Sequence, residues 1–298
     1  MIPYVRDFDF QVDISETVSP LIRRVIASNP GPFTFTGTGT FIVGRGEVAV
    51  IDPGPPLAAH LAAILAAVAG ERVSHILVTH HHADHSPLAR DLQAATGAPI
   101  YGCAMAEVAQ PAGETPLDAE YDLSFRPDIG LCDGGMVAGP GWTLEAIPTP
   151  GHTSNHLCYG LAQENARFSG DHIMGWSTTV IAPPDGDMGD YLQSLRTIRD
   201  RGFETLWPTH GPPIRAVRPF IDAYLAHRQA RLDQLLEALA SGPARIADLV
   251  PRLYADVDSR LWPAAARSMF AAVLYLAQEG QITTSGSPGP ESVYRLRS

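Results

Sequence analysis

The chain has 298 residues, 45% of them hydrophobic, which is enough for one large domain or for a domain of about 200 residues with a smaller one beside it. No apolar run is long enough to cross a bilayer, and residues 1–10 lack the pattern of a secretory signal, so we expect a cytoplasmic protein without a membrane partner. The net charge of −11 weighs against a protein that holds nucleic acid by bulk positive charge.

The first elements expected along the chain are a β-hairpin, a helix and a buried strand. Residues 40–54 contain two β-branched runs separated by Gly44 and Gly46, which is typical of a hairpin. Apolar residues recur at helical spacing over 57–70 and predict a helix there. The short apolar run 75–79 is typical of a buried strand.

A loop with four histidines, within residues 80–87, separates that strand from the next helix. Ser86 and Pro87 suit the N-cap and the first turn of this helix, and Gly97 suits its C-terminal end. A purification tag would lie at a terminus or in a polar linker, so this placement argues that the histidines belong to the fold.

Strands and one helix are expected in the middle of the chain. Residues 106–135 are rich in Gly, Pro and acidic residues and are expected to be irregular. Residues 188–201 place apolar side chains on one face and predict a helix. Short apolar runs predict strands at residues 99–101, 143–147, 156–160 and 166–169, and a last strand with its loop within 205–214.

The pattern changes beyond residue 213. Three helical and then two strand-like patterns follow, at residues 218–240, 245–254, 263–280, 281–286 and 292–297. Helices followed by a hairpin are typical of a winged-helix module, so we divide the chain into domains over residues 1–214 and 215–298. The first carries 11 Arg and 24 Asp or Glu, and the second 10 Arg and 8 Asp or Glu. Only the second is positively charged, which leaves room for an anionic partner.

The stretch VTHHHADHSP, residues 78–87, has the spacing of a metal-binding segment. Neutral imidazoles and carboxylates are good ligands of Zn²⁺ and similar ions, and His80 and His82 occupy alternate positions that can converge on one ion. The adjacent Asp84 and His85 point elsewhere, as if to a second ion about 3.5 Å away. One segment cannot complete two sites, so later segments must supply the remaining ligands.

Three later segments repeat one arrangement, a His or Asp beside a Gly just beyond an apolar run. They offer His152, Asp171 and His210. Glycine at these places lets the backbone approach a ligand or an ion closely. Four segments with this placement, at the ends of separate strands, predict a shared metal centre.

In this order, these residues resemble the metallo-β-lactamase fold superfamily of hydrolases, over roughly residues 17–214. The segments TGTGTFIVG and VIDPG are similar to the opening hairpin of that superfamily, with Asp52 at the position of an aspartate behind the metal ligands. The resemblance implies an α+β fold, an αββα sandwich with the metals at one edge, followed here by the small winged-helix-like domain.

The resemblance also implies an assignment of the ligands to two ions. His80, His82 and His152 would hold the first ion. The second would be held by Asp84, His85 and His210, and Asp171 would bridge the two.

A closer resemblance is to the β-lactamase-like protein 2 group, through GDHIMGWSTTVIAPPDGDMGDYLQSL, HGPPI, YLAHRQARLDQLLEAL and the terminal winged-helix-like segment. Members of that group include a single-strand-specific endoribonuclease, and related fungal enzymes are thioesterases acting on carrier-bound polyketides. The chain departs from it at Gly39, where many relatives have Asn, and at Asn155, where an acid is frequent. Both positions line or flank the cleft, so the substrate is not carried over.

The ligand set implies a mechanism. Two divalent ions share a water and lower its pKa toward neutrality, and the resulting bridging hydroxide attacks an acyl carbon or a phosphorus. We expect Asp84 to orient the nucleophile and to pass its proton to the leaving group, and Asp52 to orient a ligand histidine from behind. Zn²⁺ suits the donor set, and Fe or Mn tolerate it as well.

Other polar residues near the motifs have two readings. His172 is a candidate substrate contact or a hydrogen-bonding residue of its loop. Ser177, Thr178 and Thr179 are candidate substrate contacts or part of a strand edge. The remaining histidines are expected outside the chemistry: His81 as a spacer facing solvent, His156 in packing or support, and His60, His75 and His227 as structural residues. The four tryptophans form no stacking row in the sequence, so no aromatic nucleic-acid platform is expected.

We therefore predict a dinuclear metal-dependent hydrolase that acts on an ester, thioester or lactone, with a small-molecule acyl substrate. The alternative is a metal-dependent endoribonuclease on single-stranded RNA. A β-lactamase is disfavoured by the missing export signal, and a DNA-binding regulator by the small, spread charge of residues 215–298, so duplex DNA is not an expected partner. A lid over the cleft or a contact within a homo-oligomer is the expected role of this second domain.

Overall fold

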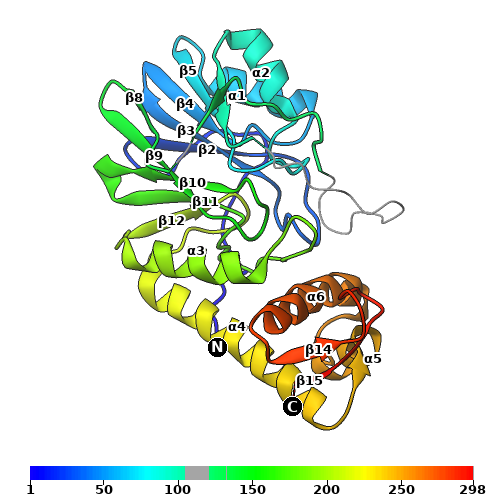
Figure 1. Ribbon diagram of the computed structural model, residues 1–298. Coiled ribbons are helices and arrows are strands. Elements are labelled where there is room, and N and C mark those ends of the chain that lie inside the picture. Colours follow the sequence, from blue (N-terminus) through cyan, green and yellow to red (C-terminus); the bar gives the residue numbers. More distant parts are fainter. Residues whose placement is uncertain (105–120, 132, 298) are drawn as a thin grey trace.

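The computed structural model describes residues 1–104, 121–131 and 133–297. Two β-sheets lie face to face in its larger part (Figure 1). The first sheet has the strand order β1 (Glu16–Thr17), β2 (Ile22–Ile26), β3 (Gly39–Arg45), β4 (Glu47–Ile51), β5 (Arg72–Leu77), β6 (Ile100–Gly102) and β7 (Ile129–Gly130). The second has the order β12 (Thr205–Pro208), β11 (Ala166–Gly170), β10 (Leu157–Leu161), β9 (Trp142–Pro148) and β8 (Met136–Gly139).

Alternation along a strand explains why the first sheet is buried on both faces. In β3, Phe41 and Val43 belong to the core between the two sheets, while Ile42 belongs to the core under two helices. Successive side chains of a strand point to opposite faces, so an unbroken apolar run is covered on both sides. The two covering helices are α1 (Ala58–Ala67) and α2 (Leu88–Thr96).

The second sheet is covered by α3 (Met188–Asp200), whose Leu195 and Ile198 share a core with Ile147 and Cys158 of the sheet. The layers are therefore helices, sheet, sheet and helix, which confirms the expected αββα sandwich.

The C-terminal elements continue the core beneath α3 rather than standing apart from it. They are the helices α4 (Val217–Ala240), α5 (Ile246–Leu253) and α6 (Trp262–Gln278), and a small sheet with the order β13 (Ala244–Arg245), β15 (Val293–Leu296) and β14 (Ile282–Thr284). One cluster of buried residues runs from α3 through α4 and α5 to α6. Figure 1 shows α4 beside α3, with its far end carrying the other C-terminal elements. This arrangement confirms the expected winged-helix-like segment.

All the helices and strands expected from the sequence are present within a few residues of the expected bounds. Two short 3₁₀ helices, Ala162–Glu164 and Ser259–Leu261, and five strands, β1, β2, β7, β8 and β13, were not expected. In β2 the apolar pattern is broken by Arg23 and Arg24, which pair with Glu71 and Glu16. Most of the segment expected to be irregular, residues 106–135, lies outside the described residues.

The start of α2 differs from the expectation for Ser86. Pro87 occupies the N-cap position, and no side chain caps the helix. The Ser86 hydroxyl instead donates to Asp122 Oδ2 at 2.8 Å and to the carbonyl of His82 at 3.3 Å. Ser86 therefore ties the histidine loop to a distant segment. Gly97 ends the helix in the left-handed conformation, as expected.

Within the described ranges, no helix combines the length and the apolar character that a membrane span requires.

Candidate metal centre

Four strand ends bring the candidate ligands to one edge of the sandwich. The loops that follow β5, β9, β11 and β12 carry, in that order, His80 to His85, His152, Asp171 and His210. Each strand ends in the core between the sheets or under α3, so the backbone fixes where each loop starts. All seven candidate ligands, His80, His82, Asp84, His85, His152, Asp171 and His210, meet in this place.

Three histidines form the first group. His80 Nε2 lies 3.0 Å from His82 Nδ1, which lies 3.1 Å from His152 Nε2. The outer nitrogen of His152, Nδ1, donates to the carbonyl of Val180 at 2.7 Å. A neutral imidazole protonated on Nδ1 has its lone pair on Nε2, so the bond to Val180 turns that lone pair toward the other two rings.

Asp84, His85 and His210 form the second group. His210 Nε2 lies 3.0 Å from Asp84 Oδ2, and His85 Nε2 lies 3.6 Å from the same oxygen. His210 Nδ1 donates to the carbonyl of Gly37 at 3.2 Å. Each histidine thus turns Nε2 toward the carboxylate and is oriented through its other nitrogen.

Asp171 lies between the two groups. Its Oδ1 is 3.4 Å from His210 Nε2 and 3.6 Å from His85 Nε2, whereas its Oδ2 is 3.8 Å from His152 Nε2. The two oxygens of one carboxylate therefore face different groups. The backbone N–H of Asp171 donates to His156 Nε2 at 3.2 Å, and His156 Nδ1 lies 2.7 Å from the Thr149 hydroxyl. His156 supports Asp171 from behind, as expected.

Asp52 orients the second group from inside the fold. Its Oδ2 accepts from His85 Nδ1 at 2.9 Å and from the hydroxyls of Thr79 and Thr209 at 2.8 and 2.9 Å, and its Oδ1 accepts from the Thr79 backbone at 2.7 Å. The side chain has no exposed surface. Asp52 therefore connects the loops after β5 and β12 through one buried carboxylate.

Protonation preferences suit a cation-binding cluster. Burial, and then the neighbouring His85, hold the pKa of His80 well below its usual range, and burial with His152 does the same for His82. Burial also opposes charge on His85, but Asp84 and Asp171 outweigh it and raise the pKa of His85 well above its usual value. His80 and His82 are thus neutral near pH 7, as metal-binding imidazoles must be.

The donor set fits a divalent metal because polar atoms are left without partners. Asp84 Oδ1, Asp171 Oδ1, His85 Nε2 and His210 Nε2 are buried and make no hydrogen bond. Unpaired buried acceptors are costly, and a bound cation would satisfy them together. Nitrogen and oxygen donors of this kind suit Zn²⁺, Fe and Mn.

The glycines beside the ligands are needed for protein packing rather than for an approach to the ions. Gly151, next to His152, has φ +131°, and a Cβ there would lie 2.4 Å from the backbone of Tyr191. Gly170, next to Asp171, has φ +51°, and its Cβ would lie 2.5 Å from His156 Nε2. These glycines lie beside the ligands as the sequence predicts, but the atoms that they approach belong to the protein.

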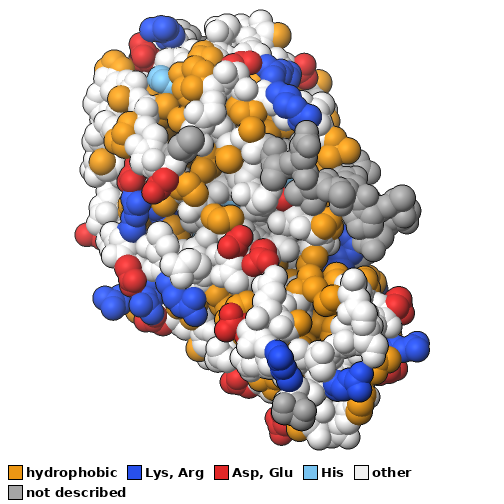
Figure 2. Space-filling view, in the orientation of Figure 1, with side chains coloured by type: hydrophobic (Ala, Val, Ile, Leu, Met, Phe, Trp, Pro, Cys, Tyr) orange, Lys and Arg blue, Asp and Glu red, His pale blue; other side chains and the backbone are white. Residues whose placement is uncertain are grey.

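A cavity of about 490 Å³ opens onto the centre. His82, Asp84, His152 and Asp171 line it on one side, and helices α4 and α6 on another. Figure 2 shows hydrophobic side chains gathered over α6, beside the hollow between it and the larger part of the molecule. The apolar residues that line the cavity from α6 and the preceding turn are Val257, Leu261, Ala264, Ala265 and Ala272, and the polar ones are Asp256, Asp258 and Ser268.

The candidate substrate contacts fall into two classes. Ser177 and Thr178 line the cavity. Thr179 also borders it, but its hydroxyl is used internally, donating to the carbonyls of Asp171 and His172 at 2.7 and 3.0 Å. His172 has no exposed surface and is not among the residues that line the cavity. A substrate contact by His172 was therefore a wrong prediction, because its ring packs against Tyr191 in the core.

His81 is not a spacer facing solvent. It is 4% exposed, and its Nδ1 donates to Asn155 Oδ1 at 2.8 Å. Its ring stacks on Tyr121 with centroids 5.1 Å apart. His81 therefore connects the histidine loop with the loop that carries His152, which sequence spacing alone does not reveal.

Residues far from the motifs also build the cavity. Tyr4 and Arg6 come from the N-terminal segment, and His227, Arg228 and Arg231 come from α4. His227, expected as a structural residue, thus also borders the cavity. Two sequence signals pointed toward α4: the charge excess of residues 215–298 and the segment YLAHRQARLDQLLEAL, which carries part of the family resemblance.

An aromatic row also reaches the cavity through Trp176, although no stacking row was expected from the tryptophans. Phe35 stacks on Trp176 with centroids 4.7 Å apart, Phe8 lies 6.2 Å from Phe35, and Phe10 lies 5.5 Å from Phe8. The spacing of the tryptophans does not reveal this row, because Phe8 and Phe10 lie together in the N-terminal segment and Phe35 lies in a separate loop.

Comparison with known proteins agrees with this geometry. Residues 34–210 match the family described as the metallo-beta-lactamase superfamily, and residues 246–290 match the beta-lactamase associated winged helix domain. The chain is 30% identical to a beta-lactamase-like protein 2 homolog of Caenorhabditis elegans, over 91% of this chain and 89% of that protein. It is 32% identical to an atrochrysone carboxyl ACP thioesterase of Aspergillus fumigatus, over 83% and 79%.

Among solved structures, a metallo-beta-lactamase family protein from Thermus thermophilus superposes with a TM-score of 0.76 at 25% identity, over 94% of this chain and 100% of that one. A beta-lactamase domain protein from Burkholderia ambifaria gives a TM-score of 0.79 at 20% identity, over 99% and 97%. The second likeness concerns the fold alone.

Proposed function

The chain belongs to the metallo-beta-lactamase superfamily and is a metal-dependent hydrolase, and from this premise we propose that it cleaves an ester, thioester or lactone at a centre of two divalent ions. His80, His82 and His152 would hold one ion, and Asp84, His85 and His210 the other. Asp171 would bridge them, because its two oxygens face different groups. When bound, such ions supply Lewis acidity and activate a water near neutral pH.

The observation that carries this proposal is the cavity that joins the metal cluster to apolar walls. Met174, Val180 and Met188 border it near the cluster, and α6 adds a further apolar side. An apolar wall beside a hydrolytic centre suits the hydrocarbon part of an acyl group. A polyphosphate chain would need a basic wall along its length.

Side chains of this protein would position the reacting groups. Asp84 Oδ1 has no hydrogen-bond partner, so it is available to hold a proton and to pass it to a leaving oxygen or sulfur. Asp52 fixes the ring of His85, and the Val180 carbonyl fixes the ring of His152. We also propose that residues 215–298 form a second domain, packed on the first through the core that α3 and α4 share, and that this domain closes the cavity over the acyl group.

The experiment is hydrolysis of p-nitrophenyl esters, a short lactone and acyl-coenzyme A, with metal-loaded protein and with the same protein after chelation. We expect turnover of at least one acyl substrate and about two metal ions per chain. Chelation should remove the metal ions and abolish the turnover. No turnover of any acyl substrate by fully loaded protein would overturn the proposal. An Arg196→Gln variant, changed at an exposed position of α3, controls for handling.

The second candidate is cleavage of single-stranded RNA, favoured by the aromatic row that ends at Trp176 in the cavity wall. Aromatic side chains stack successive bases without regard to sequence, at about 1–3 kcal/mol per base. A labelled single-stranded RNA added to the same assay tests it. If RNA is cut and no acyl substrate is, the RNA function replaces the acyl one.

A further inference from the structure

Arg228 is a buried cation in the wall of the cavity. It lies on α4, is 6% exposed, and borders the same cavity as Asp171 and His152. Moving a guanidinium out of water is expensive unless a carboxylate or another anion compensates it. The partners of Arg228 therefore decide what this position is for.

The described residues give Arg228 only neutral partners. Nη2 donates to the carbonyl of Thr179, and the guanidinium lies over the ring of Tyr191, 5.0 Å from its centroid. Nε is buried and has no hydrogen-bond partner. Across the described ranges, Arg228 forms no ion pair with a carboxylate. Its charge is thus held in place but is not balanced.

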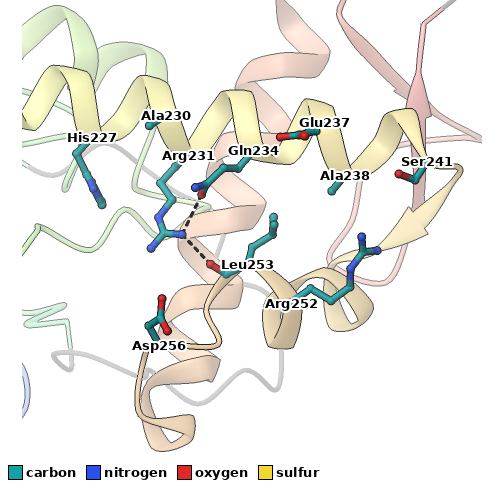
Figure 3. Close-up of a pocket in the computed structure, with 10 residues that line it drawn as sticks. All are labelled: His227, Ala230, Arg231, Gln234, Glu237, Ala238, Ser241, Arg252, Leu253 and Asp256. Atoms are coloured by element: carbon teal, nitrogen blue, oxygen red, sulfur yellow. Dashed lines mark hydrogen bonds between the residues drawn. The ribbon is translucent and has the colours of Figure 1, made fainter. Parts of the chain in front are cut away.

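Neighbouring side chains extend the positive character. Arg231, one turn along α4, borders the cavity as well, and Nη1 of its guanidinium donates to Gln234 and to the Leu253 carbonyl at 3.1 and 2.7 Å. Figure 3 shows this side chain reaching from α4 toward the turn after α5, whereas Arg252 is turned away toward Ser241. Arg228 and Arg231 therefore both border the cavity, Arg231 also borders the adjoining groove, and Arg252 borders that groove alone.

Two acidic residues, Asp256 and Asp258, border the same cavity, but within the described residues neither forms an ion pair with Arg228 or Arg231. Asp258 pairs with Arg260 at 2.5 Å, and Asp256 is exposed. The unbalanced positive charge also acts on His227, whose pKa is lowered to about 4 by burial and then by Arg228 and Arg231. A ring beside compensated arginines would not lose its proton so readily.

Arg228 and Arg231 form one end of the cavity, the arginine end, and one short segment connects this end to the metal centre. Thr179 accepts from Arg228 through its carbonyl and donates through its hydroxyl to the carbonyl of Asp171. The next residue, Val180, accepts from His152. A substrate group bound at Arg228 would therefore be held in a fixed relation to the ligands of both ions.

We propose that Arg228, with Arg231 beside it, binds an anionic oxygen group of the substrate, a carboxylate or a phosphate, at a distance from the bond that is cleaved. Two N–H donors of a guanidinium match the two oxygens of such a group. The unpartnered Tyr4 hydroxyl in the same wall is a further donor. The inference rests on the proposed function, because it takes the ligand to be part of the acyl substrate.

The first test is binding to the metal-loaded protein by calorimetry, which requires no turnover. The probes are glutarate, inorganic phosphate and the uncharged glutaramide. We expect glutarate or phosphate to bind, glutaramide to bind at least tenfold more weakly, and Arg228→Met to weaken the anion at least tenfold. Arg196→Met, at an exposed position on α3, is the matched control and should bind as the natural protein does. Equal anion affinity in Arg228→Met and Arg196→Met would overturn the proposal.

A second readout separates an anion site from a merely structural arginine. Replacing buried charged groups with apolar side chains of similar volume is often neutral or stabilising. Without anion, Arg228→Met should therefore melt at the same temperature as the natural protein or higher, and it should lose the rise in melting temperature caused by glutarate. Arg228→Lys should keep part of that rise. A lower melting temperature in Arg228→Met, with the rise retained, would mean that Arg228 only braces Thr179.

Kinetics then distinguish the two sources of the anion. The substrates are a glutaryl thioester with its free carboxylate, the same thioester capped as a methyl ester, and acetyl thioesters of pantetheine with and without a phosphate. We expect Arg228→Met to raise KM at least tenfold for one charged member and to leave the uncharged members unchanged. An equal change for charged and uncharged members would overturn the proposal. Anion binding without turnover of any thioester would instead count against the proposed function alone.

Discussion

The cavity has two buried polar ends, the metal-cluster end with the candidate metal ligands and the arginine end with Arg228 and Arg231, and the two ends present opposite kinds of atoms. At the metal-cluster end, the atoms that face inward carry unpaired lone pairs, as His210 Nε2 and Asp84 Oδ1 do, while the outward ring nitrogens form hydrogen bonds with the protein. At the second, Arg228 presents N–H donors that no carboxylate balances. A cluster of buried lone pairs without donors favours a cation, and a buried guanidinium without a carboxylate favours an anion. A single substrate that spans both ends would therefore be oriented before any bond is broken.

The largest effect is expected from Asp171→Ala, which removes the carboxylate that faces both groups of ligands. Metal content should fall from about two ions per chain to one or fewer. Activity should fall more than 100-fold, because a lost metal ion no longer stabilises the charge of the transition state, which is worth several kcal/mol. Mass spectrometry of the bound metal and an ester assay measure the two. Asp133→Ala, at an exposed position, is the control, and a variant that keeps both metals and activity contradicts the bridging role.

A smaller effect at the same end is expected from Asp52→Asn. The amide is uncharged and has one acceptor oxygen in place of two, so it cannot accept from His85 Nδ1 and from the Thr79 backbone together. Loss of such a support costs about 10–100-fold in metal affinity. Competition with a chromogenic chelator measures that affinity. The affinity for glutarate should stay unchanged, because Asp52 makes no contact with Arg228 in the described part of the chain. A parallel loss of glutarate binding would show that the two ends are not independent.

Gly151→Ala tests how the loop of His152 is held. A Cβ there meets the Tyr191 backbone at 2.4 Å, and φ is +131°, so the expected cost is about 2–3 kcal/mol of unfolding free energy. Urea denaturation measures it. Gly202→Ala is the matched control, because its φ is +70° and nothing lies within 4 Å of the added atom, which leaves a cost of about 1 kcal/mol. Equal costs would mean that the contact with Tyr191 does not constrain the loop.

The smallest effect concerns His227 and the field of the two arginines. Its pKa, lowered to about 4, lies below the value of about 6.5 in an unfolded chain. The neutral ring therefore favours folding above pH 6.5, and this contribution is lost as the pH falls toward 4. An NMR titration of the ring protons measures the pKa, and Arg231→Gln should raise it. A titration near 6.5 in the natural protein would contradict an unbalanced positive charge at this end.

Much of the metal cluster could be predicted because its residues lie directly after short apolar runs. The end of an apolar run marks the end of a buried strand, and the Gly beside His152 or Asp171 marks the sharp turn that follows. Roles set by contacts across the chain could not be predicted in the same way. His81 looks like a spacer beside His80, yet it is buried against Asn155 and Tyr121, and nothing in local spacing encodes that pairing.

The sequence by itself determined the order of the elements, the metal-binding residue types and the strand ends that carry them, because period, turn residues and ligand chemistry are local properties. Only the tertiary structure decided which side chains share the cavity. Arg228 and Tyr4 lie on segments far apart in the chain, and they meet in one wall because α4 packs under α3 and the N-terminal segment packs against α4. Whether an arginine in a helical pattern is solvated or is buried without a counterion depends on that packing.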